Sequence, residues 1–321
     1  MILVGYSVIS QLHFLNFLTY FISNKERYTD CIVFIGIYWE KSIISQEYID
    51  FAEKNNIAVV YEDKRSKIIS EFKKNKKHVD IVFVDNFSIK IMVNSFTGLK
   101  INKIILIDEG VSSYASIEHK KKAIIREKGI LWLYTRNIFY ILSNNIVKIK
   151  KIDVVNFRIF HRDSLEVNNI YKTVFIDILR DIYSRRNFVW GYNDEKIAIF
   201  CSQPYCDLGL ISIEQYKVKM LELKEIVNTK GMRLIVKKHP AESKFDYKSI
   251  GVEILNFTGA IEEFIANERV ECLISKTSTS SLIVGSVMGV KSYVLSYSDA
   301  KDLGGALEQL YTKYCFEISS I

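Results

Sequence analysis

Short runs of apolar residues alternate with longer amphipathic segments along the first half of the chain. The apolar runs span residues 2–6, 31–37, 57–61, 80–85 and 103–108. Helical periodicity follows each of the first four, over residues 10–23, 45–55, 66–74 and 88–95. Strands that alternate with helices of this length are typical of βαβ units, in which helices cover both faces of a parallel sheet. The pattern predicts a doubly wound α/β domain over residues 1–155.

The same alternation returns after an irregular, mostly helical and aromatic stretch. Apolar runs lie at residues 196–201, 233–238, 252–255, 271–275 and 291–296, and helical patterns lie at 212–229, at 258–267 and from 280 onward. We therefore expect a second doubly wound, Rossmann-like domain over residues 191–321 and a helical connection over residues 156–190. Open α/β sheets bind ligands beyond the carboxyl ends of their strands. Candidate residues are therefore sought at these ends, where the two domains are expected to face a cleft.

The composition is that of a globular protein. Apolar residues make up 49% of the 321 residues and charged residues 25%, which excludes a disordered or collagen-like chain. The five cysteines form no CxxC pair. Neither a disulfide framework nor a zinc site is expected, and a reducing compartment fits. No basic segment precedes the opening apolar run, as a secretion signal would require. These features predict a cytoplasmic protein.

Two charge and hydropathy features bear on possible partners. The formal net charge is +7, with lysine clusters within residues 73–77, 120–122 and 148–151. Solvated helix faces explain such clusters, and an anionic membrane surface or an acidic acceptor is the alternative. No nucleic-acid partner is expected, because no zinc-finger, RNP or helix-turn-helix pattern is present. The apolar stretch 129–147 carries Arg136 and three asparagines, too polar a set for a spanning helix. We expect a buried helix there, with peripheral contact to the inner membrane as the alternative.

Histidine and proline occur together at one strand end. The chain has only two prolines, Pro204 and Pro240, and both follow an expected strand of the second domain. His239 precedes Pro240, and strand alternation puts Lys237 on the same side as His239. A histidine with an ordinary pKa of ~6.5 beside a phosphate can serve as a general acid or hydrogen-bond donor. His13, in an apolar helix, is expected to have a packing or surface role.

Acidic residues also follow expected strands. Asp108, Glu109 and Gly110 close the fifth apolar run of the first domain. Two carboxylates followed by a permissive glycine are candidates for a general base, although an acidic turn that caps the next helix has the same pattern. Asp207, which follows the first strand of the second domain, is a competing carboxylate.

A hydroxyl-rich segment precedes a small-residue helix in the second domain. Residues 275–281 contain six serines and threonines, among them Ser278, Ser280 and Ser281. Ordinary helix capping needs one hydroxyl, whereas several hydroxyls beside free backbone N–H groups favour an anion site. The chain has no DxD, no GxxxxGK[ST], no strand-linked GxGxxG and no GxSxG. These absences argue against metal-gripping GT-A transferases, P-loop NTPases, Rossmann dehydrogenases and α/β-hydrolases.

The ordered motifs resemble those of bacterial GT-B sialyltransferases, especially the lipooligosaccharide sialyltransferases (glycosyltransferase family 52) and the related capsule polysialyltransferases. The matching residues are Asp108-Glu109-Gly110, Lys237-Lys238-His239-Pro240 and Ser280-Ser281. The resemblance covers about residues 1–290. It implies a GT-B fold, that is, two doubly wound Rossmann-like α/β domains that face a cleft. It also implies that an acidic residue between the HP motif and the serines, Glu262 or Glu263, holds the cytidine ribose.

The resemblance further implies inverting transfer from CMP-sialic acid, or a related CMP-nonulosonic acid, to a sugar hydroxyl of a surface glycan. That glycan is a lipooligosaccharide, O-antigen or capsule, with a lipid-linked acceptor. The donor carries a single phosphate, so no metal and no cofactor are expected. Asp108 is the expected base, with Glu109 and Asp207 as alternatives, and His239 is the acid. The expected phosphate cradle consists of Lys237, Ser278, Ser280 and Ser281.

Two other functions fit the same features. One is a GT-B transferase with another CMP- or CDP-linked donor, which would transfer Kdo or glycerophosphate. The other is a non-catalytic protein that binds a nucleotide or carbohydrate.

Overall fold

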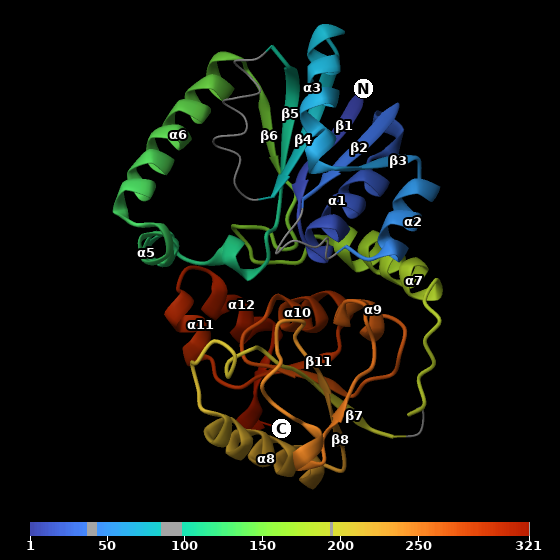
Figure 1. Cartoon of the computed structure of the whole chain (residues 1–321), viewed down its shortest axis with the longest axis vertical. Coiled ribbons are helices and arrows are strands. Elements are labelled where there is room, and N and C mark those ends of the chain that lie inside the picture. The colour runs from blue at the N-terminus through green and yellow to red at the C-terminus, as the bar shows by residue number, and fades with distance from the viewer. Residues whose placement is uncertain (37–43, 85–97, 193–194, 321) are drawn as a thin grey trace. The chain divides into compact units, whose positions relative to one another are not determined.

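A computed structural model describes residues 1–36, 44–84, 98–192 and 195–320 of the chain. The chain divides into two compact units, Met1–Ile182 and Tyr183–Ile321, which are coloured from blue to green and from yellow to red in Figure 1. The helix expected at residues 88–95 lies outside the described residues.

The first unit is built on a parallel sheet with helices on its faces. Within the described residues its strand order is β3-β2-β1-β4-β5-β6. The strands are β1 (Ile2–Val8), β2 (Asp30–Ile35), β3 (Ile57–Tyr61), β4 (His78–Val84), β5 (Lys100–Ile107) and β6 (Asp153–Asn156). The α-helices are α1 (Gln11–Ser23), α2 (Gln46–Lys54), α3 (Arg65–Lys74), α5 (Ile117–Lys128), α6 (Ile130–Ile149) and α7 (Ile176–Ser184).

The side chains of β1 point alternately to the two faces of this sheet. Val4 and Tyr6 lie in a core cluster with Ile69 of α3. Gly5 points the other way, toward α1, where an added Cβ would lie 2.6 Å from the ring of Phe17. A side chain at position 5 would therefore push α1 off the sheet.

The second unit repeats this plan. Within the described residues its strand order is β12-β11-β10-β7-β8-β9, again all parallel. The strands are β7 (Ile197–Cys201), β8 (Arg233–Lys237), β9 (Glu253–Ile254), β10 (Cys272–Ser275), β11 (Lys291–Val294) and β12 (Phe316–Glu317). The α-helices are α8 (Ile213–Thr229), α9 (Ile261–Ile265), α10 (Thr279–Ile283), α11 (Ser298–Leu303) and α12 (Leu307–Tyr314).

Numbered within its own sheet, each unit has the strand order 3-2-1-4-5-6 of a dinucleotide-binding fold. The expectation of two doubly wound α/β domains is confirmed. The strand order reverses between β1 and β4 in the first sheet and between β7 and β10 in the second. Ligands of such sheets bind beyond the carboxyl ends of the strands at this reversal.

Most of the stretch expected as a connection, residues 156–182, belongs to the first unit. Its aromatic residues pack on α1: the ring of Phe157 lies 5.1 Å from that of Tyr20 and 5.5 Å from that of Tyr171. Tyr171 and Phe175 are completely buried. Aromatic packing against α1 therefore makes this segment part of the first core.

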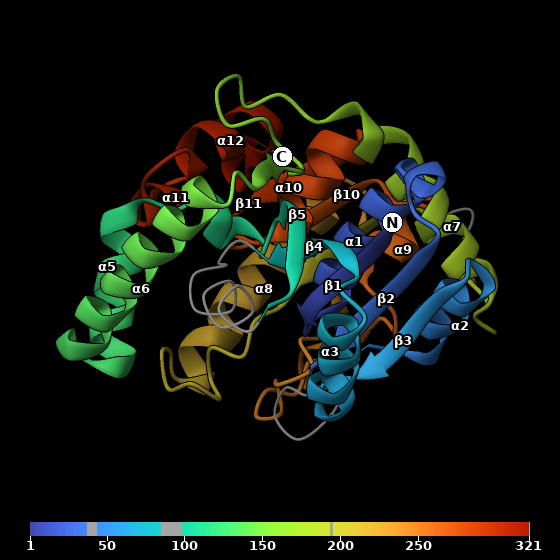
Figure 2. The same cartoon turned by 90° about the horizontal axis from the view of Figure 1, so that it is seen from above.

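The expectation that the apolar stretch 129–147 forms a buried helix is wrong. The stretch forms α6, and most of its side chains are exposed. Val147 is half-buried and packs against the core of the first unit. Figure 2 shows α5 and α6 side by side. Among the described residues, none of the helices combines the length and the apolar character needed to cross a bilayer.

Candidate functional site

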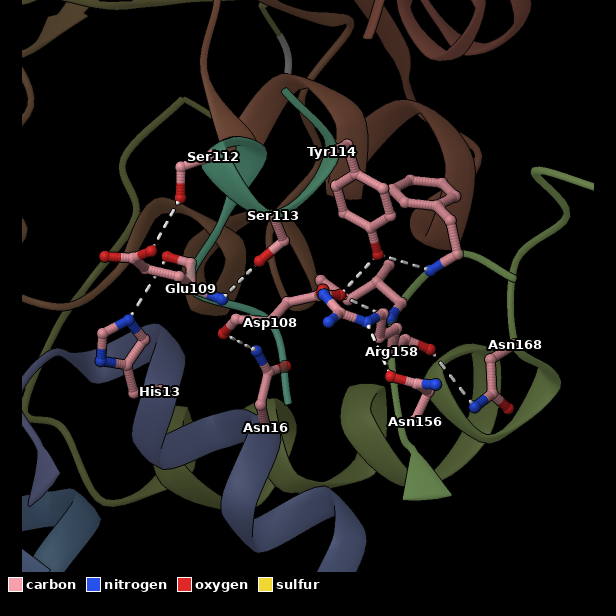
Figure 3. Close-up of polar contacts among 12 residues, drawn as sticks. His13, Asn16, Asp108, Glu109, Ser112, Ser113, Tyr114, Asn156, Arg158 and Asn168 are labelled. Atoms are coloured by element: carbon pink, nitrogen blue, oxygen red, sulfur yellow. Dashed lines mark hydrogen bonds and ion pairs between the residues drawn. The ribbon is translucent and has the colours of Figure 1, made fainter. Parts of the chain in front are cut away.

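The carboxylate of Asp108 lies inside the first unit, just beyond the end of β5 (Figure 3). Its Oδ1 accepts a hydrogen bond from Arg158 Nη1 at 3.0 Å. Its Oδ2 accepts from the Tyr114 hydroxyl at 2.6 Å and from the backbone N–H of Ile159 at 2.8 Å. Burial raises the pKa of Asp108, and these donors act in the opposite direction.

The expectation that Asp108 points out of the strand end toward a substrate is therefore wrong. Its side chain has no exposed surface, and each oxygen is already bound to a donor from the same unit. A buried carboxylate needs such partners, and here it ties the loop after β5 to the loop after β6. The side chain cannot reach an acceptor hydroxyl unless its hydrogen bonds to Arg158, Tyr114 and Ile159 break.

Glu109, the next residue, has an exposed side chain. Its Oε2 accepts a hydrogen bond from the Ser112 hydroxyl at 3.1 Å, and its backbone N–H donates to Ser113 Oγ at 2.9 Å. Gly110 follows with φ 128° and ψ −153°, a backbone conformation that favours glycine. The turn at Gly110 thus leaves a held but accessible carboxylate at the end of β5.

Two buried polar side chains of α1 support this turn. His13 Nε2 donates to the carbonyl of Glu109 at 3.3 Å, and Asn16 Nδ2 donates to the carbonyl of Asp108 at 3.2 Å. Burial lowers the pKa of His13 to about 4, although the bond to the Glu109 carbonyl opposes the change. Within the described part of the chain, His13 Nδ1 has no hydrogen-bond partner. His13 is therefore a neutral, packed histidine that positions the backbone of Glu109.

His239 lies in the second unit, two residues after β8. Its backbone N–H donates to Ser202 Oγ at 3.1 Å, and its Nδ1 accepts from the backbone N–H of Ala241 at 3.1 Å. Because Nδ1 is an acceptor, the proton of the neutral ring resides on Nε2. Partial burial lowers the pKa of His239, and the charge of Glu242 opposes this effect. The neutral ring is thus held at Nδ1 and carries its N–H donor on Nε2.

Glu242 and Ser202 are part of this arrangement, and sequence analysis did not identify them. The buried carboxylate of Glu242 accepts hydrogen bonds from the hydroxyls of Ser202 and Tyr247. Ser202 also receives the His239 N–H, so it links the loop after β7 to the loop after β8. The spacing His-Pro-Ala-Glu was the available signal, because a tight turn brings residues three apart together: the Glu242 N–H donates to the His239 carbonyl at 3.0 Å.

Lys237, expected in the phosphate cradle, has its ammonium bound elsewhere. Its Nζ donates to the carbonyl of Phe257 and lies 5.5 Å from the centroid of the Phe257 ring. Burial is the main reason that the pKa of Lys237 is lowered. Strand alternation sends Lys237 to the α9 side of the sheet together with Ile235. Its expected direct contact with a phosphate is not supported by this geometry.

The carboxylate of Asp207, the competing candidate for the base, is held by the loop after β8. One oxygen, Oδ1, accepts from the Ser243 hydroxyl at 2.6 Å, from the Ser243 N–H at 3.0 Å and from the Lys244 N–H at 3.2 Å. The Ser243 hydroxyl is the main cause of the lowered pKa of Asp207. Asp207 thus joins the loop after β7 to Ser243 and Lys244 in the loop after β8, which contains His239 and the exposed Pro240.

The serines after β10 divide into one buried and one accessible group. Ser281 is completely buried and bonds to the hydroxyls of Ser275 and Ser278. Ser278 caps α10 by accepting the Ser281 N–H at 3.2 Å. This burial argues against the expected contact of Ser281 with a ligand. Ser280 is half-buried, and its hydroxyl lies next to the carboxylate of Glu262, whose pKa it lowers.

The two candidate acidic residues of α9 also separate. Glu263 is completely buried in an ion pair with Arg186, with Oε2 2.6 Å from Nε. It also accepts the backbone N–H of Ala260 at 2.9 Å. Burial raises the pKa of Glu262, and the bond from Ser280 opposes this rise. Glu263 is therefore structural, and Glu262 is the acidic residue that adjoins the serine segment.

Strand register brings the second-unit residues to one edge. Cys201, the last residue of β7, pairs with Lys237 of β8 on one side and with Ser275 of β10 on the other. The loops that carry Ser202, His239 and Ser280 therefore leave the sheet at the same level, next to the strand reversal. In the described ranges, no group of His, Cys, Asp and Glu residues has the arrangement of a metal site.

Comparisons with known proteins give a family for the chain and similar folds. The family model described as Alpha-2,8-polysialyltransferase (POLYST) matches residues 33–297. A comparison with the sequences of curated proteins found no significant match.

Solved structures share the fold of the chain at low sequence identity. A Photobacterium damselae sialyltransferase GT-B domain has 14% identity and a TM-score of 0.51, with 99% of this chain and 100% of that chain covered. A Methanocaldococcus jannaschii UDP-GlcNAc 2-epimerase in complex with UDP-GlcNAc and UDP has 11% identity and a TM-score of 0.52, with 99% and 88% covered. Such similarity shows the fold alone. The expected GT-B class is confirmed.

Proposed function

Because the chain belongs to the alpha-2,8-polysialyltransferase family, we propose that it transfers sialic acid, or a related nonulosonic acid, from a CMP donor to a sugar hydroxyl of a bacterial surface glycan. The family's description suggests the acceptor: the C8 hydroxyl of a sialic acid already on the glycan. We further propose that the glycan is carried on a lipid and that transfer inverts the anomeric configuration.

One observation carries the donor half of this proposal. The loops after β7, β8 and β10 begin at the same level of the second sheet, beside its strand reversal. The segment after β8 carries the Nε2–H donor of His239, and the segment after β10 carries the hydroxyl of Ser280. The buried carboxylate of Glu262, on α9, adjoins Ser280. A CMP leaving group needs a donor for its phosphate, and its ribose hydroxyls suit a carboxylate acceptor.

His239 is the proposed donor to the departing phosphate. Its Nδ1 is occupied by Ala241 N–H, so the ring cannot flip without losing that bond. Burial lowers the pKa of His239 and the charge of Glu242 opposes this, and in the neutral ring the proton lies on Nε2. As negative charge builds on the phosphate in the transition state, a fixed Nε2–H stabilises it more than water does.

Glu109 is the proposed base in place of Asp108. Its carboxylate is accessible and is held by Ser112. A carboxylate in hydrogen-bond reach of the acceptor hydroxyl can remove its proton as the new glycosidic bond forms. His13 and Ser113 hold the backbone of Glu109, His13 at its carbonyl and Ser113 at its N–H.

We propose that the reaction needs no divalent metal. A CMP donor has one phosphate on the anomeric carbon, so the charge to be neutralised is smaller than that of a diphosphate. A histidine donor with a hydroxyl and backbone N–H groups can supply that neutralisation.

The test combines donor binding with product analysis. Thermal-shift measurements with CMP, UDP and GDP should show preferential stabilisation by CMP, and a preference for UDP would overturn the donor assignment. Incubation with CMP-sialic acid and a sialylated oligosaccharide should extend the oligosaccharide in excess EDTA, as mass spectrometry can detect. His239→Ala is the matched inactive variant. Extension from CMP-Kdo alone would favour a Kdo transferase, and CMP binding without any transfer would favour a non-catalytic protein.

A further inference from the structure

The helix α6 carries an apolar stripe that nothing in the described chain covers. Its members recur at spacings of three, four or seven residues, which places them on one side of a helix. They are Leu131, Tyr134, Ile138, Ile141, Leu142 and Ile149, and all are exposed. Leu131 and Ile149, near the two ends of the helix, are each 80% exposed. Large apolar side chains lined up in this way mark an interaction surface.

The opposite side of α6 is the one that faces the protein. Leu133, Phe139 and Ile146 are half-buried, and Ser143 is buried. These residues face α5 and the body of the unit, to which Val147 attaches the helix. The exposed stripe is therefore not an unfilled part of the core.

Helices α5 and α6 form a hairpin, and its formal charge equals the net charge of the whole protein. Residues 117–151 contain nine lysines and arginines and two glutamates, a formal charge of +7. The whole chain has a net charge of +7, so all its other residues together are neutral. On α5 the exposed cations include Lys121, Lys122 and Lys128, and Lys128 Nζ lies 5.4 Å from the centroid of the Trp132 ring.

This combination selects among possible occupants. A second copy of the chain would bring two +7 hairpins together, which repel each other. A soluble polyanion would use the cations but leave the stripe of large apolar side chains in water. An anionic lipid bilayer satisfies both, because its headgroups attract lysine and arginine while its acyl boundary takes up apolar side chains.

We propose that the α5–α6 surface, the exposed side chains of residues 117–149, docks the protein on an anionic lipid membrane. Helix α6 lies along the interface with its apolar stripe toward the acyl chains. Lys148 of α6 and the exposed Lys121, Lys122 and Lys128 of α5 lie at headgroup level. Trp132, whose ring Lys128 contacts, has the amphipathic ring that favours this zone. The proposal goes beyond the proposed transferase activity and does not depend on it.

Vesicle co-sedimentation of the full chain tests this surface. Vesicles of phosphatidylcholine with phosphatidylglycerol should bind the protein, and vesicles of phosphatidylcholine alone should bind it much less. The triple variant Leu131→Gln, Ile138→Gln, Ile141→Gln should lose roughly tenfold or more in binding. Lys121→Gln with Lys122→Gln should also lose about tenfold or more, since each cation near an anionic surface strengthens binding several-fold.

Matched controls exist elsewhere on the protein. Val218→Gln, Leu221→Gln, Ile226→Gln removes three exposed apolar side chains from α8. Lys74→Gln with Lys77→Gln removes two exposed lysines, one at the end of α3 and one just before β4. Both controls should bind like the original chain. Circular dichroism checks that every variant is folded. Trp132 fluorescence should shift to the blue on the anionic vesicles, and Trp132→Phe should remove that shift.

Several results would overturn the proposal. The first is that the protein does not bind anionic vesicles. The second is that the control variants lose as much vesicle binding as the α5–α6 variants. The third is that both α5–α6 variants still bind the vesicles. Binding to polysialic acid without vesicle binding would assign the surface to a polyanion. A dimer, measured by light scattering, that the triple variant alone converts to a monomer would assign it to self-association. None of these measurements uses the sugar donor, so their failure is distinct from failure of the transferase proposal.

Discussion

Arg158 and Asp108 form an ion pair of 3.0 Å whose side chains are 3% and 0% exposed. The two residues follow neighbouring strands, β6 and β5, which pair in parallel. The pair therefore joins the two loops at the carboxyl edge of the first sheet. The carboxylate beside it, Glu109, remains accessible because Asp108 takes the inward position.

Removing the Asp108 carboxylate should mainly destabilise the first unit. Asp108→Ala leaves the Arg158 cation buried without its partner, which costs about 3–5 kcal/mol of unfolding free energy. Urea unfolding, with hydrogen exchange of β5 to identify the unit, measures the loss. Glu109→Gln is the control, with an expected change within about 0.5 kcal/mol because the side chain is exposed. A stable Asp108→Ala protein would contradict the structural role.

Glu109→Gln should reduce turnover while donor binding stays nearly intact. If Glu109 removes the acceptor proton, its contribution arises in the transition state, so kcat should fall about 10²–10⁴-fold. Calorimetry with CMP should give the affinity of the original chain. Asp207→Asn is the comparison, because Asp207 binds the loop after His239 and should alter CMP affinity or stability first. Full kcat in Glu109→Gln with none in Asp207→Asn would move the base to the second unit.

Glu242→Gln should shift the pH profile of the reaction. The charge of Glu242 raises the pKa of His239, so its removal lowers that pKa further. The neutral ring of His239 is the proposed active form, because its Nδ1 accepts the Ala241 N–H and its Nε2–H can donate to the phosphate. The rate should fall as pH drops through the pKa and Nδ1 gains a proton. The acid limb of kcat/KM should therefore move to lower pH, and His239→Ala should remove the limb. An unchanged limb in folded Glu242→Gln would show that Glu242 does not position or tune this histidine.

Substitutions of Ser280 and of Ser281 should have different effects, because Ser280 is proposed to contact the ligand and Ser281 to pack inside the unit. Ser280→Ala should weaken CMP binding by roughly 1–2 kcal/mol, as for one hydrogen bond to a charged group. Ser281→Ala should leave CMP affinity unchanged and lower stability by about 1–2 kcal/mol, since Ser275 and Ser278 lose a buried partner. Calorimetry and thermal unfolding of the two variants check this contrast. The reverse pattern would make Ser281, in place of Ser280, the ligand contact.

His13 should make the first unit acid-sensitive. Its pKa is about 4 in the folded chain and ~6.5 when unfolded. The unfolded state therefore binds the extra proton between these values, and stability falls as pH drops from about 6.5 toward 4. The loss between pH 7 and pH 5 should be about 2 kcal/mol. A His13→Gln variant should lack this part of the slope, and urea unfolding at both pH values measures the difference.

The alternation of apolar runs and amphipathic segments was enough to predict two parallel α/β domains. Burial on both faces of a parallel sheet requires such runs, so the pattern reflects the fold directly. It also located the ends of β5, β8 and β10, where Glu109, His239 and Ser280 lie. Short-range spacing carries this information because each residue follows its strand in the chain.

Local pattern could not predict which member of each pair of neighbours is buried. Asp108 turns inward because Arg158 lies 50 residues later on the next loop, and Glu263 does so because Arg186 lies 77 residues earlier. Glu242 was missed for the same reason, since its partners Ser202 and Tyr247 meet only in the folded unit.

The sequence by itself determined the two Rossmann-like sheets and the order of their strand-end motifs, because hydrophobic periodicity is written along the chain. Only the tertiary structure decided which carboxylates and hydroxyls are accessible, and that α6 is exposed instead of buried. An apolar helix has the same pattern of apolar residues whether it packs in the protein core or against something outside the chain. Burial depends on residues distant in sequence, so it emerges only when the units fold.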